Sequence, residues 1–223
     1  MGSELGERLR GLYAITPEIA DTAELVARVE QCLEGGAALV QYRAKRAAPA
    51  LALEQARRLA SLCRSFGVPL IVNDSIEIAA ASGAQGIHLG RDDAAIHEAR
   101  RTLPGAIVGV SCYSNPDLAR AAADAGADYV AIGSVFASAT KPQAVRAPLA
   151  CIAEARNAGL PVAAIGGITL DNAQRALDAG ADMLAVISAL FDAPDIRSAA
   201  RAFSDRFENA TPDKRGRPQS RAL

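Results

Sequence analysis

The chain alternates short apolar runs with longer amphipathic segments, and this alternation repeats eight times. The apolar runs are almost continuous in Val, Ile, Leu and Ala, which is typical of parallel strands that are buried on both faces. The segments between them, such as 23–34, 50–66 and 118–125, have helical periodicity and are long enough for several turns. The expected strands are 12–16, 38–42, 70–73, 86–89, 107–111, 129–132, 162–165 and 184–187.

A recurring glycine indicates that a βαβα unit is repeated. Gly36, Gly83, Gly126 and Gly180 come just before the second, fourth, sixth and eighth expected strands. Each falls where a helix would end in a left-handed residue before the chain turns into a strand. Eight parallel strands with such repeats predict a single-domain (β/α)8 TIM barrel, for which 223 residues are near the lower end of the usual length. An open doubly wound sheet, which usually has five or six strands, is the structural alternative.

The two ends of the chain fall outside this scheme. Residues 1–8 are expected to form a loose lead-in, and residues 9–207 the barrel that carries the catalytic residues. From position 208 to 223 the chain is polar and basic, with Lys214, Arg215, Arg217 and Arg221. We expect this segment to be a disordered, solvated tail.

The formal net charge of −1 gives no global field that would attract nucleic acid or an anionic membrane. Affinity for phosphate must therefore come from a local cluster of residues. No apolar run approaches the roughly 18 residues of a membrane span, and the first ten residues contain no apolar signal core. We expect a cytoplasmic protein that acts on small molecules, and the sequence leaves open whether copies associate into a homo-oligomer.

The cysteines at positions 32, 63, 112 and 151 are widely separated and form no C-x-x-C pair. The chain has only two histidines to accompany them. We therefore expect neither a zinc site nor a disulfide framework.

In a barrel of this kind the active site forms at the carboxyl ends of the strands. The second expected strand ends in Gln41, Arg43 and Lys45, which share one face of an extended segment because they alternate along the chain. The planar fork of an arginine and the mobile charge of a lysine suit a pyrophosphate. A solvated basic turn, which would include Arg46, is an equally good interpretation of this stretch taken alone.

Carboxylates follow the next two expected strands. Asp74 follows Asn73 at the end of the third strand, and Asp92 and Asp93 lie in the loop after the fourth. Each could be a helix cap. Two adjacent loops that bring carboxylates to a basic mouth instead predict a Mg²⁺–pyrophosphate site, because Mg²⁺ is commonly bound by one or two carboxylates together with phosphate oxygens and water.

Hydroxyl groups follow the fifth and sixth expected strands. Ser111 ends the fifth, where a turn-initiating serine is an equally good interpretation. The loop at 133–143 is the longest break in the pattern and contains Ser138, Thr140 and Lys141. A long loop over a barrel mouth is often a functional lid, and Lys141 would suit an anion.

A second phosphate site is expected after the last two strands. The seventh ends in Gly166 and Gly167, and the eighth in Ile187 and Ser188. Glycines let backbone N–H groups approach an oxyanion, and these loops form the recurrent phosphate site of such barrels. Two phosphate sites on one mouth imply two phosphorylated substrates or one bisphosphorylated substrate.

These residues also bear on the kind of reaction. A pyrophosphate held by Mg²⁺, arginine and lysine is a good leaving group, since positive charge stabilises it as it departs. No Ser/His/Asp or Cys/His pairing is visible that would indicate a covalent nucleophile. His88 falls within an expected strand and His97 on an expected helix, so we expect core or surface roles for both.

The assembled motifs resemble the thiamine phosphate synthase family, and the resemblance runs from about Leu12 to Phe207. Each motif is short, but nine of them occur in order at the expected strand ends. They are Tyr-x-Ile-Thr (13–16), Gln-x-Arg-x-Lys (41–45), Asn-Asp (73–74), Gly-x-His-Leu-Gly-x-x-Asp (86–93), Gly-Val-Ser (109–111), Asp-Tyr-Val-Ala-x-Gly (128–133), Thr-Lys (140–141), Ile-Gly-Gly-Ile (165–168) and Ile-Ser (187–188).

The resemblance implies a transferase reaction. Hydroxymethylpyrimidine diphosphate would lose pyrophosphate in a dissociative, carbocation-like step, and a thiazole phosphate would capture the pyrimidine to give thiamine phosphate. Catalysis would rest on positioning and leaving-group charge, with Lys141 and Ser111 as the catalytic residues. The implied site residues are Gln41, Arg43, Lys45, Asn73, Ser111 and Lys141 for the pyrimidine diphosphate, Asp74 and Asp93 for Mg²⁺, and Ser138, Thr140, Gly167, Ile187 and Ser188 for the thiazole phosphate.

The chain departs from the family pattern at two positions, Arg91 where glutamine is usual and Ser138 where threonine is common. Ser138 keeps the hydroxyl, and Arg91 adds a cation beside the expected metal loop. The closest alternative is a thiazole tautomerase of the same fold, which needs neither the metal carboxylates nor the Arg/Lys pair and carries a histidine that is absent from residues 111–114 here. A sugar-phosphate isomerase with Asp74 as its base, or a non-catalytic binder of thiamine precursors, are further alternatives.

Overall fold

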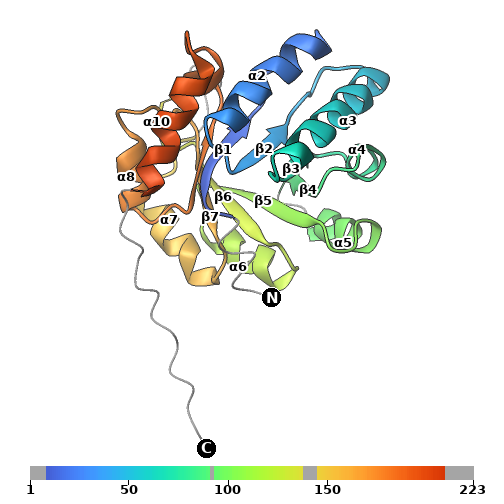
Figure 1. Cartoon of the computed structure of the whole chain (residues 1–223). Helices are drawn as coiled ribbons and strands as arrows, with labels where there is room; N and C mark the ends of the chain where they lie inside the picture. The colour runs from blue at the N-terminus through green and yellow to red at the C-terminus, as the bar shows by residue number, and fades with distance from the viewer. Residues whose placement is uncertain (1–8, 91–92, 138–144, 209–223) are drawn as a thin grey trace, which may run out of the picture.

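The computed structural model describes residues 9–90, 93–137 and 145–208. In this part of the chain eight parallel strands form a closed barrel in sequence order, and β8 pairs with β1 to close it. Figure 1 shows the strands at the centre with the helices around them. The predicted (β/α)8 barrel is therefore confirmed. The strands are β1 (Gly11–Ile15), β2 (Leu39–Tyr42), β3 (Leu70–Asn73), β4 (Gly86–Leu89), β5 (Ile107–Tyr113), β6 (Tyr129–Gly133), β7 (Val162–Ile165) and β8 (Met183–Val186).

The helices connect successive strands, and local signals fix where several of them begin. Asp21 caps the first described helix by accepting hydrogen bonds from the amides of Ala23 and Glu24 at 2.7 and 2.9 Å. Pro49 opens the next helix at a position where no N–H partner is needed. The helices are α2 (Thr22–Glu34), α3 (Pro49–Ser65), α4 (Ile76–Ser82), α5 (Asp93–Thr102), α6 (Asp117–Asp124), α7 (Ala150–Ala155), the 3₁₀ helix η1 (Arg156–Ala158), α8 (Ala173–Asp178), α9 (Ser188–Phe191) and α10 (Ile196–Glu208).

The expected strands agree with the structure to within one residue at almost every end. The exception is β5, which continues to Tyr113, two residues past its expected end. Its pairing with β6 shifts register between Ser111 and Tyr113. This irregularity places Ser111 inside a strand, and the interpretation of Ser111 as the start of a turn is therefore wrong.

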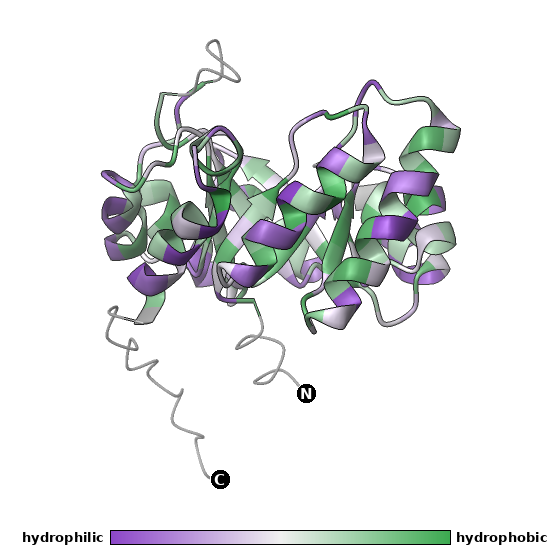
Figure 2. Ribbon diagram, turned by 45° about the horizontal axis from the view of Figure 1, so that its top comes forward, coloured by the Kyte–Doolittle hydropathy of each residue, from purple (hydrophilic) through white to green (hydrophobic). Residues whose placement is uncertain are grey.

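Two apolar cores stabilise the fold. One fills the barrel and includes Tyr13, Leu39, Ile71 and Tyr129. The other lies between the strands and the surrounding helices, because both faces of each strand are covered. Figure 2 shows the hydrophobic strands in the centre and helices that alternate hydrophilic and hydrophobic residues along their length. Because both faces of each strand are buried, the strands appear in the sequence as continuous apolar runs.

The expected helix-ending glycines adopt the left-handed conformation. Gly36, Gly83, Gly126 and Gly180 have φ of 94°, 78°, 96° and 98°. Left-handed glycines between a helix and the next strand are more frequent than the sequence pattern suggested. Gly67, Gly105 and Gly159 precede the odd strands β3, β5 and β7 with φ of 69°, 80° and 79°.

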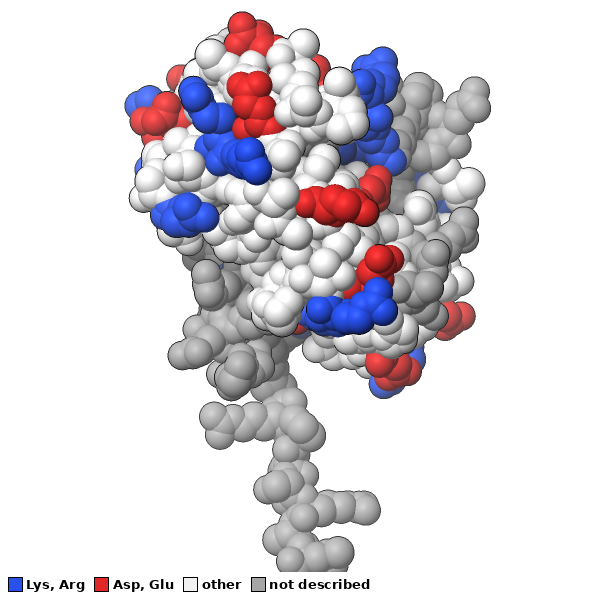
Figure 3. All heavy atoms as spheres, turned by 90° about the vertical axis from the view of Figure 1, so that its right-hand side faces the viewer, with Lys and Arg blue, Asp and Glu red and all other residues white. Residues whose placement is uncertain are grey.

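The barrel surface offers no long-range charge pattern on the face that carries α3, α4 and α5. Figure 3 shows acidic and basic side chains interspersed there. None of the helices in the described ranges is long and apolar enough to cross a membrane. The cysteines at positions 32, 63, 112 and 151 are free, buried thiols. Burial raises the pKa of each thiol, to about 12 for the first three.

Candidate active site

A cavity of about 610 Å³ lies at the carboxyl ends of the strands, and we call it the central cavity. Residues of all eight strands line it, together with residues of the loops that follow them. Most of its polar lining comes from β2 to β5, as the sequence predicted. Its lining includes Tyr13, Gln41, Arg43, Lys45, Asn73, Asp74, His88, Gly90, Ser111, Tyr113, Ser114, Ser134, Ile165, Gly166, Ala185 and Ile187.

The end of β2 places Gln41, Arg43 and Lys45 on the cavity, as their alternation predicted. The loop after β1 holds this segment in place. The backbone N–H of Arg43 donates to Thr16 Oγ1 at 2.9 Å, and that of Lys45 donates to Glu18 Oε1 at 2.9 Å. Because two of the three side chains are cationic, this edge of the cavity suits an anion.

The neighbouring Arg46 does not belong to this group. Its Nε donates to Glu18 Oε2 at 3.1 Å, and its side chain is largely exposed. The basic stretch is therefore divided: Arg43 and Lys45 line the cavity, whereas Arg46 is paired at the surface.

After β3, Asn73 and Asp74 both line the cavity. Asn73 Nδ2 donates to Asp74 Oδ2 at 2.6 Å, and Lys45 Nζ lies 3.5 Å from the same oxygen. Asp74 is not the cap of the following helix. Ser75 takes that role, because its hydroxyl accepts a hydrogen bond from the amide of Ile78. With the cap supplied by Ser75, the carboxylate of Asp74 is available to the cavity.

Asp74 has an unusual backbone conformation, with φ of 65°. A non-glycine residue in this region is uncommon and costs roughly 1 kcal/mol or more, which points to a functional constraint. The amide of Asp74 donates to the carbonyl of His88 on β4 at 2.9 Å, which holds the turn. The strained turn keeps the carboxylate at the rim beside Lys45.

On β5, Ser111 lies deep in the cavity against His88 of β4. His88 Nε2 and Ser111 Oγ are 2.9 Å apart. His88 is buried, and burial lowers its pKa to about 4, partly offset by the negative charge of Asp74, which raises it. The imidazole is therefore neutral at physiological pH.

The glycine of the Gly-Val-Ser motif has a packing role. A Cβ at Gly109 would lie 2.0 Å from the ring of Tyr129, so only glycine lets that ring lie across β5. Tyr129 OH in turn lies 2.9 Å from His88 Nδ1. The motif thus positions both the serine and the ring that reaches its histidine partner.

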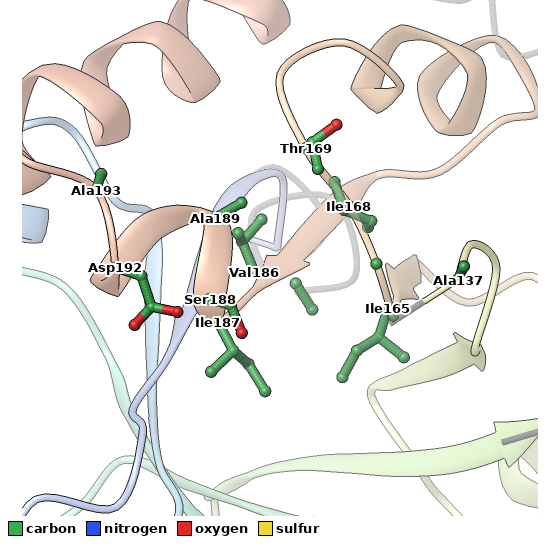
Figure 4. Close-up of a pocket in the computed structure, with 13 residues that line it drawn as sticks. Ala137, Ile165, Ile168, Thr169, Val186, Ile187, Ser188, Ala189, Asp192 and Ala193 are labelled. Carbon is green, nitrogen blue, oxygen red and sulfur yellow. The ribbon is translucent and has the colours of Figure 1, made fainter. Parts of the chain in front are cut away.

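A second cavity, of about 440 Å³, lies between the ends of β7 and β8, and we call it the β7–β8 cavity. Figure 4 shows Ile187 and Ser188 on one side of it and Ile165 and Ile168 on the other, with Asp192 at the edge. Gly167 also lines it, so three residues expected to hold the thiazole phosphate lie together.

The two cavities adjoin. Ile165, Gly166, Ala185 and Ile187 line both of them. A molecule in the central cavity and another in the β7–β8 cavity would therefore meet at this shared wall.

The two glycines after β7 are required by the loop that follows β6. A Cβ at Gly167, which has φ of 63°, would lie 2.1 Å from the carbonyl oxygen of Ala137. The amide of Phe136 also donates to the carbonyl of Gly166 at 3.0 Å. From the sequence, we expected glycines here because they let backbone N–H groups approach a phosphate. Close packing against the loop after β6 is a second reason.

Several expected site residues cannot be placed. Ser138, Thr140 and Lys141 lie outside the described residues, as does Arg91. Asp93 is the first residue of α5, but its side chain also lies outside what the structure describes.

The residues that are present fit a magnesium ion that shares its ligands with a substrate. Asp74 provides a carboxylate at the rim of a cavity that is lined by two cations. Within the described ranges, no group of three or more His, Cys, Asp or Glu side chains could hold a metal alone. A single carboxylate is enough for an ion that takes its remaining ligands from phosphate oxygens and water.

Four residues that line or support the central cavity had no predicted role in the site: Tyr13, His88, Tyr113 and Tyr129. His88 is in register with Asn73 on β3 and with Gly109 on β5. Since alternate residues of a strand share a face, extending the alternation of Gln41 and Arg43 to each neighbouring strand could have identified it. Tyr113 is half exposed with φ of 53°, and no sequence signal marked the bulge that directs it to the cavity.

Comparison with known proteins agrees with this geometry. The family model described as thiamine monophosphate synthase matches residues 12–190. The thiamine-phosphate synthase of Aromatoleum aromaticum is 56% identical over 203 residues, which cover 90% of this chain and 98% of the relative. That of Thiobacillus denitrificans is 58% identical over 199 residues, covering 88% and 94%.

A solved structure shows the same relationship. The thiamine phosphate pyrophosphorylase from Pyrococcus furiosus superimposes with a TM-score of 0.79 at 35% identity, covering 90% of this chain and 96% of the other. Together with a family match that spans most of the barrel, these similarities are decisive. The chain belongs to the thiamine monophosphate synthase family.

Proposed function

We propose that the protein condenses hydroxymethylpyrimidine diphosphate with thiazole phosphate to give thiamine phosphate and pyrophosphate. The observation that carries this proposal is the pair of adjoining cavities, one of which has a cationic rim. Two separate phosphorylated molecules can be held there with their reactive ends at the wall shared by Ile165, Gly166, Ala185 and Ile187. The names of the relatives in the same family support this choice of substrates.

The central cavity would take the pyrimidine diphosphate. Arg43 and Lys45 supply positive charge for the diphosphate, and Asn73 and Ser111 supply polar groups beside it. Gln41 is buried at the floor of the cavity, where its amide suits a polar ring. Lys141 would add a further charge from the loop after β6, as the family resemblance implies.

Asp74 would bind Mg²⁺, with Asp93 as the second carboxylate. The ion would neutralise charge on the diphosphate and so make it a better leaving group. Asn73 donates to Asp74 at 2.6 Å and thereby orients the carboxylate. Lys45 stands close to the same carboxylate, so the metal and the cation would act on one diphosphate.

The β7–β8 cavity would take the thiazole phosphate. Gly167, Ile187 and Ser188 would hold the phosphate through backbone N–H groups and the serine hydroxyl. Ser138 and Thr140 would add hydroxyl groups from the loop after β6. Asp192 at the edge of this cavity carries a negative charge, so the phosphate would lie on the side of Ser188.

The reaction would be a substitution at the methylene carbon of the pyrimidine. The carbon–oxygen bond breaks first and its electron pair leaves on the diphosphate, and the lone pair of the thiazole nitrogen then forms the new carbon–nitrogen bond. Arg43, Lys45 and Ser111 oppose the negative charge that develops on the leaving oxygen. The shared wall holds both reactants close, so the electrophile meets nitrogen rather than water.

We also propose that this reaction takes place in the cytoplasm, because both substrates are multiply charged and do not cross a bilayer unaided.

The function is tested with purified protein, Mg²⁺ and the two substrates. Equal amounts of pyrophosphate and thiamine phosphate are expected, with no thiamine phosphate when either substrate is left out. No product with both substrates, together with turnover of a thiazole carboxylate phosphate tautomer, would instead establish the tautomerase.

A further inference from the structure

A chain of hydrogen bonds crosses the floor of the central cavity from β2 to β5. Gln41 Nε2 lies 2.8 Å from Tyr13 OH, which lies 2.7 Å from Tyr129 OH. Tyr129 OH lies 2.9 Å from His88 Nδ1, and His88 Nε2 lies 2.9 Å from Ser111 Oγ. Only Ser111 and Gln41 belong to the substrate site proposed above, so the three residues between them have no assigned role.

The protons of this chain can be counted. Gln41 donates from its amide nitrogen to Tyr13, so the single phenolic proton of Tyr13 is free for Tyr129. Tyr129 then accepts from Tyr13 and must donate to His88 Nδ1. A neutral imidazole that accepts at Nδ1 carries its proton on Nε2, and therefore donates to Ser111 Oγ. The hydroxyl proton of Ser111 is left to point into the cavity.

Burial keeps every member of the chain in one protonation state. Tyr13 and Tyr129 are 1% and 0% exposed, and desolvation raises the pKa of both phenols. His88 is 7% exposed, and both of its ring nitrogens face hydroxyl groups rather than a carboxylate, which suits a neutral imidazole. With these groups uncharged and no buried side-chain polar atom left unsatisfied in the described residues, the direction of every donor follows from which atom of the Gln41 amide faces Tyr13, and in this structure that atom is Nε2.

We propose that Tyr13, Tyr129 and His88 are positioning residues that hold Ser111 as a hydrogen-bond donor toward the diphosphate. This inference rests on the function proposed above. An anion needs donors, and a serine that donated inward to His88 would turn only lone pairs toward it. Aligned hydrogen bonds polarise one another, so the chain strengthens the donor that meets the developing charge. No proton is transferred along the chain.

The opposite sense of the chain is the clear alternative. Ser111 would donate to His88 Nε2, His88 Nδ1–H to Tyr129, and the phenols onward to the amide oxygen of Gln41. The two senses differ in the tautomer of His88, which is measurable without any substrate.

The tautomer is read from long-range ¹H–¹⁵N NMR spectra at pH 7. The protein has two histidines, and His97 is exposed on α5. In the variant His97→Gln the remaining histidine signal therefore belongs to His88. We expect a protonated Nε2 and an unprotonated Nδ1 at His88. A protonated Nδ1, or an equal mixture of tautomers, would overturn the proposal. Absence of synthase activity would refute the proposed function but would leave this reading of the spectrum unchanged.

Substitution of His88 gives a kinetic test. His88→Gln keeps an amide donor near the position of Nε2, whereas His88→Asn places its amide nearer Nδ1 and cannot reach Ser111. We expect kcat to fall more than tenfold in the asparagine variant and to recover at least threefold with glutamine. Equal kcat values in the two variants would show that His88 acts by volume alone.

Two variants that each remove one buried phenol hydroxyl form a matched pair. Tyr129→Phe breaks the chain, while Tyr42→Phe removes an equally buried phenol whose hydroxyl donates to Gln55 Oε1 at 2.8 Å, outside the cavity. We expect Tyr129→Phe to lower kcat about tenfold and to mix the tautomers of His88, with Tyr42→Phe within about twofold of the parent. An equal effect of both variants on kcat, with the tautomer of His88 unchanged, would refute the positioning role.

Discussion

Lys45 Nζ lies 3.5 Å from Asp74 Oδ2, so a cation from the end of β2 and a carboxylate from the end of β3 are adjacent at the rim of the central cavity. Both side chains are about half exposed, at 51% and 55%, and such a pair contributes little to folding stability. Its interest is chemical. A diphosphate that arrived with Mg²⁺ would offer oxygens to Lys45 and a cation to Asp74. Lys45 and Asp74 would then each exchange their contact with one another for a contact with the substrate complex.

Asp74→Asn should therefore weaken Mg²⁺ use without unfolding the protein. We expect the Mg²⁺ concentration for half-maximal rate to rise by about tenfold or more, because a ligating carboxylate is lost. The free energy of unfolding should change by less than about 0.5 kcal/mol, as for other exposed substitutions. The measurements are a Mg²⁺ titration of the initial rate and a urea unfolding curve.

Glu77→Gln is the matched control for Asp74→Asn. Glu77 is an exposed carboxylate three residues away on α4, where it accepts from Ser75 at 2.8 Å, and it does not line the central cavity. An unchanged Mg²⁺ dependence in Asp74→Asn, or the same change in both variants, would exclude Asp74 as a metal ligand.

His88 should make the protein sensitive to acid. Its pKa is about 4 in the folded state, where burial disfavours the charged form, against 6.5 for the free side chain. The groups that face the ring are Tyr129, Ser111 and the more distant carboxylate of Asp74. Between pH 6.5 and 4 the unfolded chain binds more protons, so stability is complete above pH 6.5 and falls as the pH drops toward 4, by about 3 kcal/mol in total.

Urea unfolding at pH 7.5 and pH 4.5 measures this loss. His88→Gln cannot titrate, so its stability should fall by about 2 kcal/mol less than that of the parent over this interval. Carboxylates that titrate in the same range contribute to both proteins and cancel in the comparison. Parallel losses in the two proteins would show that His88 is not held neutral by burial.

The opposite end of the barrel should govern stability rather than activity. Asp128 Oδ2 accepts from the amide of Val108 at 2.7 Å and from Arg100 Nη2 at 2.6 Å, and Arg100 also donates to the carbonyls of Gly126 and Ala106. Asp128 thereby ties the start of β6 to the start of β5. Asp182 repeats this contact by accepting from the amide of Val162 at 3.0 Å, as expected of a repeated βαβα unit.

Asp128→Ala should therefore destabilise the fold by about 2 kcal/mol, because the amide of Val108 and the guanidinium of Arg100 both lose a partly buried acceptor. Both KM values and kcat should stay within about twofold of the parent at 25 °C, since the site lies at the other end of the strands. Thermal unfolding followed by circular dichroism and steady-state kinetics check the two parts. A large change in KM with normal stability would contradict the assignment.

Most of the fold could be predicted from the sequence, and the reason lies in the burial of the strands. Both faces of each strand are covered, so every strand appears as an apolar run that turn residues interrupt. The end of β5 could not be predicted, because the bulge between Ser111 and Tyr113 depends on pairing with β6.

Some residues of the site could likewise be predicted from the sequence, and others could not. Arg43, Lys45, Asp74 and Ser111 were predictable because the carboxyl ends of parallel strands meet at one edge. His88 and Tyr129 were not recognised, because a continuous apolar run reveals which residues face the barrel interior only once its register with a neighbouring strand is known. Their contacts join residues 41 positions apart, which no local pattern records.

The central claim is that the mouth has two halves, one for the diphosphate that leaves and one for the phosphate that stays. Arg43→Met removes a charge from the central cavity, and Ser188→Ala removes a hydroxyl from the β7–β8 cavity. Ser188 is a better probe than Gly167, where any side chain would clash with the carbonyl of Ala137. Steady-state KM values for both substrates are measured on both variants.

We predict a crossed result. Arg43→Met should raise the KM for hydroxymethylpyrimidine diphosphate about tenfold or more and leave that for thiazole phosphate within about twofold. Ser188→Ala should raise the KM for thiazole phosphate by about fivefold and leave that for the pyrimidine diphosphate within about twofold. If each variant changed both KM values alike, or if the pattern were reversed, the division of the mouth into two halves would be wrong.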